Sequence, residues 1–234
     1  MAELGAHFAT NPMKLVVEQV PKFGRLPPNA FCTQANQDAR QICIAGILPR
    51  WSPIMNNSLR STTSCLAVID WQERLFPAMP EAHRDRALAR ASDLVWLARS
   101  LDMPVIASEQ YPKGLGSTLD RLGIDEAVSK TTFSALKEPK FAACLTQNAR
   151  HQIILTGMEA HICVAQTACD LIRAGHEVWV VADAVLSRRT LDWSLGIERM
   201  RNAGAVIVTA EAAMFELLGQ AGGPIFKELS RRIR

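Results

Sequence analysis

The sequence predicts an α/β protein of three layers, with a mostly parallel sheet of about six strands between two layers of helices. From residue 65 onward, short apolar runs of strand length alternate with longer segments whose apolar residues recur at helical spacing. The short runs are continuously apolar, which is typical of parallel strands buried on both faces. Together these two observations favour a Rossmann-like sheet covered by helices on both sides.

The first half of this region contains three of the expected strands and one long helix. Residues 65–70, 104–109 and 127–130 are the strand-length runs, and residues 80–101 form the helix. Residues 110–123 are rich in turn residues, so they are expected to form a loop with at most a short helix. The helix is predicted from one apolar stripe, which consists of Ala87, Leu88, Ala91, Leu94, Val95 and Ala98.

The second half continues the alternation. The expected strands are residues 151–155, 176–182 and 205–209, and the expected helices are residues 139–148, 161–174, 190–203 and 211–218. Pro139 suits the first turn of a helix, and Gly175 and Gly204 suit helix ends.

Residues 1–60 differ from the rest, so we divide the chain into a leader (1–60) and a globular domain (61–234). The leader contains six prolines and little apolar periodicity, and we expect it to be poorly ordered. It lacks the apolar core of a secretory signal. Two alternatives stay open: a mitochondrial transit segment, although three acidic residues weaken that reading, or an over-extended gene start with Met55 as the natural first residue.

Composition narrows the function classes. The leader carries six Lys/Arg and three Asp/Glu, which leaves 20 of each from the totals of 26 and 23, so the domain is neutral and no nucleic-acid partner is expected. No apolar run reaches membrane-spanning length, so no membrane partner is expected either. The six cysteines have neither zinc-ligand nor disulfide-scaffold spacing, which favours a reducing compartment, here the cytoplasm.

Cys163 is the first candidate for chemistry. The next expected helix begins about six residues after the expected strand 151–155, and Cys163 falls in the first turn of that helix. Unpaired backbone N–H groups and the positive end of the helix dipole gather at such a position. We therefore expect the pKa of this thiol to be lowered and the thiol to be partly ionised near neutral pH.

Two further reactive side chains lie at strand ends. Asp70 and Lys130 end the first and third expected strands, and Cys163 follows the fourth by one turn. Ligands of parallel α/β sheets bind at the carboxyl ends of the strands, so these three residues are candidates for one site.

Residues 65 to about 219 resemble the isochorismatase-like cysteine hydrolases, a group that includes nicotinamidases and N-carbamoylsarcosine amidase. The residues that carry the resemblance are Val68-Ile-Asp70-Trp-Gln72, Lys130-Thr-Thr-Phe133-Ser134, Thr156-Gly157 with Cys163-Val164, and Ala182-Asp183-Ala184. Two other segments, Glu109 to Gly116 and Glu159 to Cys163, look most like members whose physiological substrate is unassigned.

The resemblance implies an Asp–Lys–Cys triad. Cys163 is then the nucleophile, Asp70 the general base that later returns a proton to the leaving group, and Lys130 the cation that supports both. It also implies a cis peptide at Met158–Glu159 and an oxyanion hole formed by the backbone N–H groups of Glu159 and Cys163.

The chain departs from the nicotinamidases of this group. Those enzymes bind a metal through an Asp/His/His set, whereas residues 108–112 here contain no histidine, so we expect neither a metal nor a cofactor. True isochorismatases lack the cysteine, and its presence here favours C–N bond cleavage over vinyl-ether hydrolysis.

Four residues are candidates for substrate binding: Gln72, Glu109, Tyr111 and Phe133. Gln72 is equally suited to binding backbone near Asp70, and both aromatic residues are equally suited to core packing. His161 lies two residues before Cys163, a spacing that directs the two side chains apart, so a Cys–His dyad is not favoured.

The sequence thus predicts a metal-independent cysteine hydrolase of small amide or ureido substrates, working through a thioester and assembling as a homo-oligomer. The alternative from another class is a non-catalytic, oligomeric binding protein that keeps the fold. An oxidoreductase is disfavoured because no glycine fingerprint for a dinucleotide follows a strand.

Overall fold

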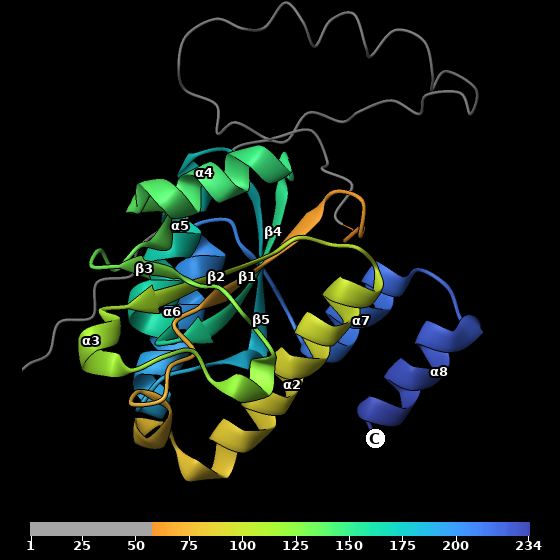
Figure 1. The fold of residues 1–234 in the computed structure, drawn as a ribbon, viewed down its shortest axis with the longest axis horizontal. Helices are drawn as coiled ribbons and strands as arrows, with labels where there is room; N and C mark the ends of the chain where they lie inside the picture. The colour runs from red at the N-terminus through yellow and green to blue at the C-terminus, as the bar shows by residue number, and fades with distance from the viewer. Residues whose placement is uncertain (1–57) are drawn as a thin grey trace, which may run out of the picture. The chain divides into compact units, whose positions relative to one another are not determined.

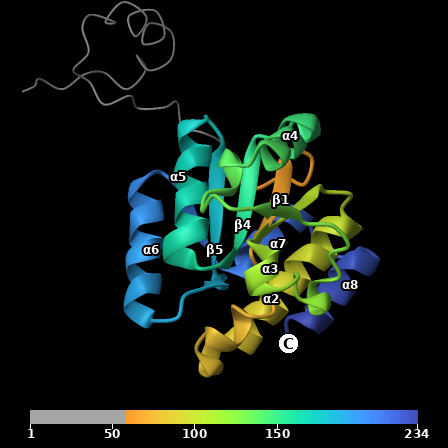
Figure 2. The same ribbon diagram turned by 60° about the vertical axis from the view of Figure 1, so that its left-hand side comes forward.

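The computed structural model describes residues 58–234, and the predicted leader therefore lies almost entirely outside the described residues. Figure 1 shows the sheet with its helices, and Figure 2 shows the same ribbon from a second direction. Leu59 is buried and its backbone N–H donates to Glu216, so the described fold includes the residues just before the first strand. No helix within residues 58–234 is long and apolar enough to cross a membrane.

Six parallel strands form one sheet in the order β3-β2-β1-β4-β5-β6. Their bounds are β1 Ser64–Ile69, β2 Val105–Gln110, β3 Val128–Lys130, β4 Gln152–Met158, β5 Glu177–Leu186 and β6 Val206–Val208. β1 and β4 lie at the centre and every residue in them is buried, which explains their continuously apolar sequences. The predicted α/β class and the six-stranded parallel sheet are confirmed.

Seven α-helices are present in the described part of the chain. Their bounds are α2 Glu81–Ser100, α3 Pro112–Leu115, α4 Pro139–Asn148, α5 Ala165–Arg173, α6 Thr190–Asn202, α7 Ala210–Leu218 and α8 Gly223–Arg232. The helices α2 and α7 pack on one face of the sheet, with α8 against α2, and α4, α5 and α6 cover the other face (Figure 2). Two separate apolar cores form, one on each side. The predicted stripe of α2 is buried throughout.

Four elements differ from the sequence-based expectations. β4 runs to Met158, three residues beyond the strand expected over residues 151–155. The helix predicted over residues 161–174 begins as a π-helical turn, Ala160–Val164, before α5 starts. β5 extends past residue 182 to Leu186, because its register against β4 shifts between Leu155 and Gly157 and the extra residues bulge. For α8, the basic residues 231–234 indicated only the end of a helix, and the rest of α8 was not predicted.

Gly157 brings the end of β4 close to the end of β1. Its φ is 156°, and a Cβ there would lie 2.3 Å from the carbonyl oxygen of Ile69. Only glycine therefore permits this approach, which sets the β4 end beside Asp70.

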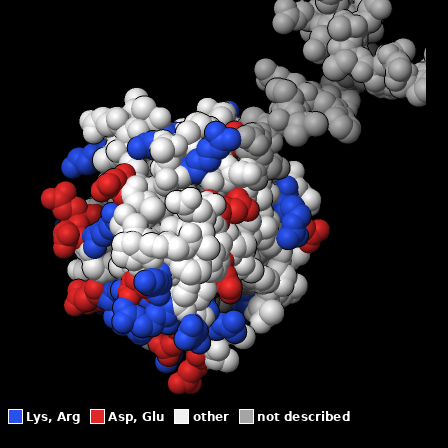
Figure 3. All heavy atoms as spheres, turned by 90° about the vertical axis from the view of Figure 1, so that its right-hand side faces the viewer, with Lys and Arg blue, Asp and Glu red and all other residues white. Residues whose placement is uncertain are grey.

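The face that carries α7 and α8 has a mostly uncharged middle with side chains of both signs around it (Figure 3).

Candidate active site

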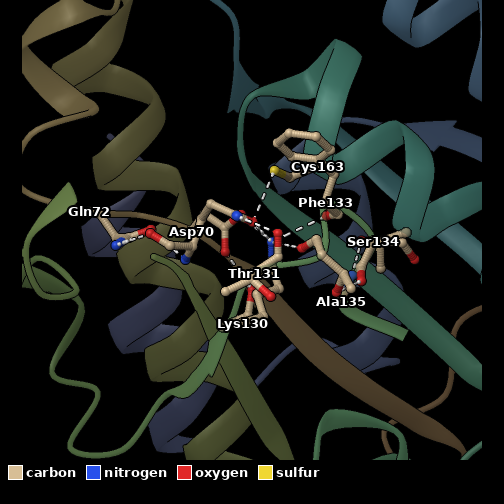
Figure 4. A network of polar contacts seen from close by, with 12 residues as sticks. Asp70, Gln72, Lys130, Thr131, Phe133, Ser134, Ala135 and Cys163 are labelled. Atoms are coloured by element: carbon tan, nitrogen blue, oxygen red, sulfur yellow. Dashed lines mark hydrogen bonds and ion pairs between the residues drawn. The ribbon is translucent and has the colours of Figure 1, made fainter. Parts of the chain in front are cut away.

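The site lies at the carboxyl edge of the sheet, where strand ends meet. Asp70 follows β1, Lys130 is the last residue of β3, and Cys163 lies in the π-helical turn after β4. Figure 4 shows the three side chains around one network of polar contacts. The structure thus brings together residues that are 33 to 93 positions apart in the sequence.

Asp70 and Lys130 form an ion pair with no exposed side-chain surface. The ammonium of Lys130 donates to Oδ2 of Asp70 over 2.8 Å, and the hydroxyl of Ser108 donates to Oδ1 over 2.7 Å. The backbone of Asp70 is left-handed (φ 53°), a conformation that Asp adopts more readily than most residues. Both carboxylate oxygens are therefore held in place by hydrogen bonds.

Lys130 has three further acceptors. Its Nζ lies 2.6 Å from Oε1 of Gln110 and 3.2 Å from the carbonyl oxygens of both Thr132 and Phe133. The ammonium is thus fully hydrogen-bonded although it is buried, as a buried charge requires.

Gln110 is the residue of this network that sequence reasoning missed. Its Oε1 accepts from Lys130 and lies 4.0 Å from Sγ of Cys163, and its Nε2 donates to the carbonyl oxygen of Thr131. Side chains alternate along a strand, so Ser108 and Gln110 share a face of β2. That alternation predicts the place of Gln110 only once the structure has shown that Ser108 faces Asp70.

Cys163 is buried, with 6% of its surface exposed. Burial raises the pKa of the thiol to about 12; the negative charge of Asp70 acts in the same direction, and Lys130 opposes it. The expectation of a thiol with a lowered pKa, partly ionised near neutral pH, is therefore wrong. The loss of hydration outweighs the helix terminus, and the turn at this position is π-helical.

Burial also raises the pKa of Asp70, while the Lys130 ammonium and the hydrogen bonds from Lys130 and Ser108 lower it. A carboxylate with a raised pKa is a stronger base than an ordinary aspartate, and it faces a protonated thiol. The arrangement suits a proton transfer from sulfur to carboxylate during a reaction.

The peptide Met158–Glu159 is cis, at the position that the resemblance implied. The Glu159 side chain is buried and pairs with Nε of Arg188 over 2.5 Å, and Nε2 of His161 lies 3.4 Å from it. His161 also places Nδ1 2.9 Å from the hydroxyl of Ser187. These contacts direct His161 toward Glu159 and Ser187, in keeping with the expectation that it forms no dyad with Cys163.

The four residues predicted for substrate binding are placed differently from one another. Gln72 is buried, and its side-chain amide forms hydrogen bonds with the backbone of Gln110 and Gly116. It therefore stabilises the loop between these two residues. Glu109 points to the other face of β2 and accepts from the N–H and hydroxyl of Thr118, away from the triad. Tyr111 and Phe133 are 55% and 53% exposed.

Asp183, a matching residue of the resemblance, accepts a hydrogen bond from the backbone N–H of Ala210 and so caps α7. Within the described residues, no group of three or more His, Cys, Asp or Glu side chains is arranged to hold a metal ion.

The isochorismatase domain model matches residues 64–212, the stretch that contains the sheet and the triad. The chain belongs to the isochorismatase family. Isochorismatase domain-containing protein 1 of Danio rerio is 37% identical over 180 residues, covering 76% of this chain and 63% of the relative. The chain therefore spans less than two thirds of that relative's length.

Solved structures of other proteins share the fold. MAR1 ribonuclease from Caenorhabditis elegans is 37% identical, with a TM-score of 0.69 over 75% of this chain and 92% of its own. The Escherichia coli ycaC gene product, an octameric hydrolase of unknown specificity, is 21% identical, with a TM-score of 0.66 over 71% of this chain and 84% of its own. That second likeness concerns the fold alone.

Proposed function

We propose that this member of the isochorismatase family is a cysteine hydrolase that cleaves a C–N bond of a small amide or ureido substrate. The observation that carries the proposal is the buried network in which Asp70, Lys130 and Cys163 meet from three separate elements. Burial of an ion pair beside a thiol costs desolvation free energy, and such arrangements cluster at functional sites. This supports a joint role of the three groups in a reaction.

In the first step the sulfur of Cys163 attacks the carbonyl carbon of the substrate, and the thiol proton moves to the Asp70 carboxylate. The C=O π pair moves to the oxygen, which the backbone N–H groups of Glu159 and Cys163 stabilise. Donors of this kind contribute roughly 10²–10³ in rate. The raised pKa of Asp70 favours its acceptance of the proton.

In the second step the tetrahedral intermediate collapses to a thioester and the C–N bond breaks. Asp70 returns its proton to the leaving nitrogen, so an amine or ammonia departs. Water then attacks the thioester and Asp70 takes the water proton. The C–S bond breaks as the acid product forms, and Asp70 returns the proton to the departing sulfur, which restores the thiol. Lys130 stays hydrogen-bonded to Asp70, as an ion pair while Asp70 is ionised, and its positive charge offsets the negative charge when this lies on the carboxylate, the sulfur or the oxyanion.

These steps require no cofactor or metal. Tyr111 and Phe133 are proposed to contact the substrate, because both are exposed and both flank the backbone that surrounds Lys130. Gln72 and Glu109 are proposed to act on the loop that carries Tyr111, since their side chains are bonded to that loop.

The experiment is a screen of small primary amides and ureido compounds with the full chain. Released ammonia or amine is measured, and the acyl-enzyme is trapped by acid quench and located by mass spectrometry. We expect turnover with the acyl group on Cys163, no turnover by Cys163→Ala, loss of at least 10²-fold in Asp70→Asn, and no effect of EDTA. Cys169→Ala, which removes a partly exposed thiol of α5, is the matched control.

Two outcomes would count against the hydrolase. If no compound is turned over and none acylates Cys163, the non-catalytic binding protein is the better account. If RNA added in parallel is cleaved while every amide is inert, the activity named for the C. elegans relative applies instead. The neutral charge balance and the mixed charges in Figure 3 do not favour RNA.

We also propose that the chain forms a homo-oligomer and acts in the cytoplasm. Two large apolar side chains of α6, Leu191 and Leu195, are 66% and 54% exposed, which suits a contact with a second copy. Light scattering of the wild type and of Leu191→Ser/Leu195→Ser tests this. A monomeric wild type would rule the assembly out.

A further inference from the structure

A cavity of about 430 Å³ lies beside the carboxyl end of β5, and neither Asp70, Lys130 nor Cys163 lines it. It is bordered by the start of α2, the start of α6 and Thr209, the N-cap residue of α7. Its volume falls within the range of small-molecule sites. Its apolar lining is formed by Pro80, Ala87, Ala182, Val185, Leu186 and Trp193.

The polar groups of the cavity favour an anion. Arg86 and His83 line it, both are exposed, and within residues 58–234 neither lies within 4.0 Å of a carboxylate. Thr190 and Thr209 also line the cavity, and they lie at the starts of α6 and α7. The positive ends of both helix dipoles are therefore near this cavity. The carboxylate of Asp183 also lines the cavity, and its Oδ1 accepts from the N–H of Ala210 at the α7 start. Its negative charge counts against an anion, whereas Arg86 and the two helix starts count for one.

We propose that this cavity is a second ligand site, which binds a small aromatic or branched aliphatic carboxylate. The apolar body of the ligand packs against Trp193 and Leu186, and its carboxylate pairs with Arg86. An arginine suits this task because its guanidinium can donate two parallel hydrogen bonds to a carboxylate. The indole N–H of Trp193 already donates to the carbonyl oxygen of Val185, so the ring is held in place.

A series of contacts links the cavity to the nucleophile turn, the π-helical turn Ala160–Val164 that contains Cys163. Ser187 lines the cavity, and its hydroxyl lies 2.9 Å from Nδ1 of His161, two residues before Cys163. The next residue, Arg188, pairs with Glu159 at the start of that turn. A ligand that shifts Ser187 therefore changes the surroundings of Cys163, so the reactivity of the thiol reports occupancy.

Binding is tested by calorimetry with the full chain, using 3-phenylpropionate and 4-methylpentanoate as probes and 3-phenylpropanol as the uncharged counterpart. We expect saturable binding of at least one carboxylate, with the alcohol and the variant Arg86→Gln weaker by about tenfold, as the loss of a hydrogen bond to a charged group implies. Arg99→Gln, at the far end of the same helix, is the matched control and keeps wild-type affinity. Ala182→Leu, which fills part of the cavity, abolishes binding.

No saturable binding of either carboxylate, or equal affinity in Arg86→Gln and wild type, would overturn the proposal. If the probes fail and Ala182→Leu instead changes the mass in light scattering, the cavity is an interface between copies and not a ligand site. The connection is read from the iodoacetamide rate at Cys163, pH 9, by mass spectrometry. Saturating probe changes this rate at least twofold in wild type and not in Ser187→Ala; an unchanged wild-type rate refutes the connection. This readout needs no amide turnover, so it is independent of the proposed function.

Discussion

Nζ of Lys130 lies 2.8 Å from Oδ2 of Asp70, and neither side chain has any exposed surface. A buried ion pair gives little net stability compared with an apolar pair, but removal of one partner leaves a buried charge without compensation. Substitution of one partner should therefore lower the stability of the protein more than substitution of both.

We predict that Lys130→Met lowers the free energy of unfolding by about 3–5 kcal/mol. Lys130→Met/Asp70→Asn should lose clearly less, because no unpaired charge stays in the interior. Urea unfolding at pH 7 measures both, and Lys137→Met, an exposed lysine seven residues on, is the control. Equal losses in the single and double variants would show that the pair carries no buried charge.

The raised pKa of Cys163 predicts a loss of stability in alkali. The thiol pKa is about 12 in the folded state against 9.0 as its ordinary value, so the unfolded chain releases this proton first and stability falls as the pH rises from 9 toward 12. At pH 10.5 the expected contribution of this group is about 2 kcal/mol, from 1.36 kcal/mol for each pH unit above 9.

The measurement is urea unfolding at pH 8 and pH 10.5. Cys163→Ala should show a smaller fall between the two than wild type, and Cys169→Ala, which removes a partly exposed thiol, is the matched control. An identical fall in Cys163→Ala and wild type would mean that the folded thiol ionises as readily as the unfolded one.

Gly196 of α6 packs directly on the nucleophile turn. A Cβ there would lie 2.9 Å from Cα of His161 and 3.1 Å from the carbonyl carbon of Ala160. We predict that Gly196→Ala destabilises the protein by about 1–3 kcal/mol through overpacking and changes the iodoacetamide rate at Cys163. In an exposed helix the same change is stabilising by about 1 kcal/mol. Thermal unfolding decides the sign, with Ser194→Ala, exposed on the same helix, as the control.

Gln110→Glu adds a negative charge about where Oε1 now lies, 4.0 Å from the sulfur of Cys163. A nearby like charge disfavours the thiolate, so the thiol pKa should rise further. We predict a three- to tenfold slower iodoacetamide reaction at pH 9, roughly the effect of half to one pKa unit. Glu109→Gln changes the adjacent residue on the opposite face of β2 and should leave the rate unchanged. A faster reaction in Gln110→Glu would place the added carboxylate away from the thiol.

The sheet could be predicted because the pattern that indicates each strand lies within the strand's own residues. Buried parallel strands must be apolar along their whole length, and α2 must present one apolar stripe, so both can be recognised without knowledge of their neighbours. Asp183 was misleading, because a charged residue inside β5 looks like a strand end. Its carboxylate caps α7, a partner 27 positions away that the sequence does not reveal.

The sequence by itself determined the fold class, the family resemblance and the edge of the sheet at which Asp70, Lys130 and Cys163 meet, since parallel strands bring their carboxyl ends to the same edge. Only the tertiary structure decided the state of the thiol. Position at a helix start predicted a lowered pKa, but burial and the charge of Asp70 raise it, and both depend on packing from distant segments. The tertiary structure also decided that Gln110 joins the network while Glu109 does not. Adjacent residues of a strand point to opposite faces of the sheet, and the register of β2 sets which of the two faces the triad.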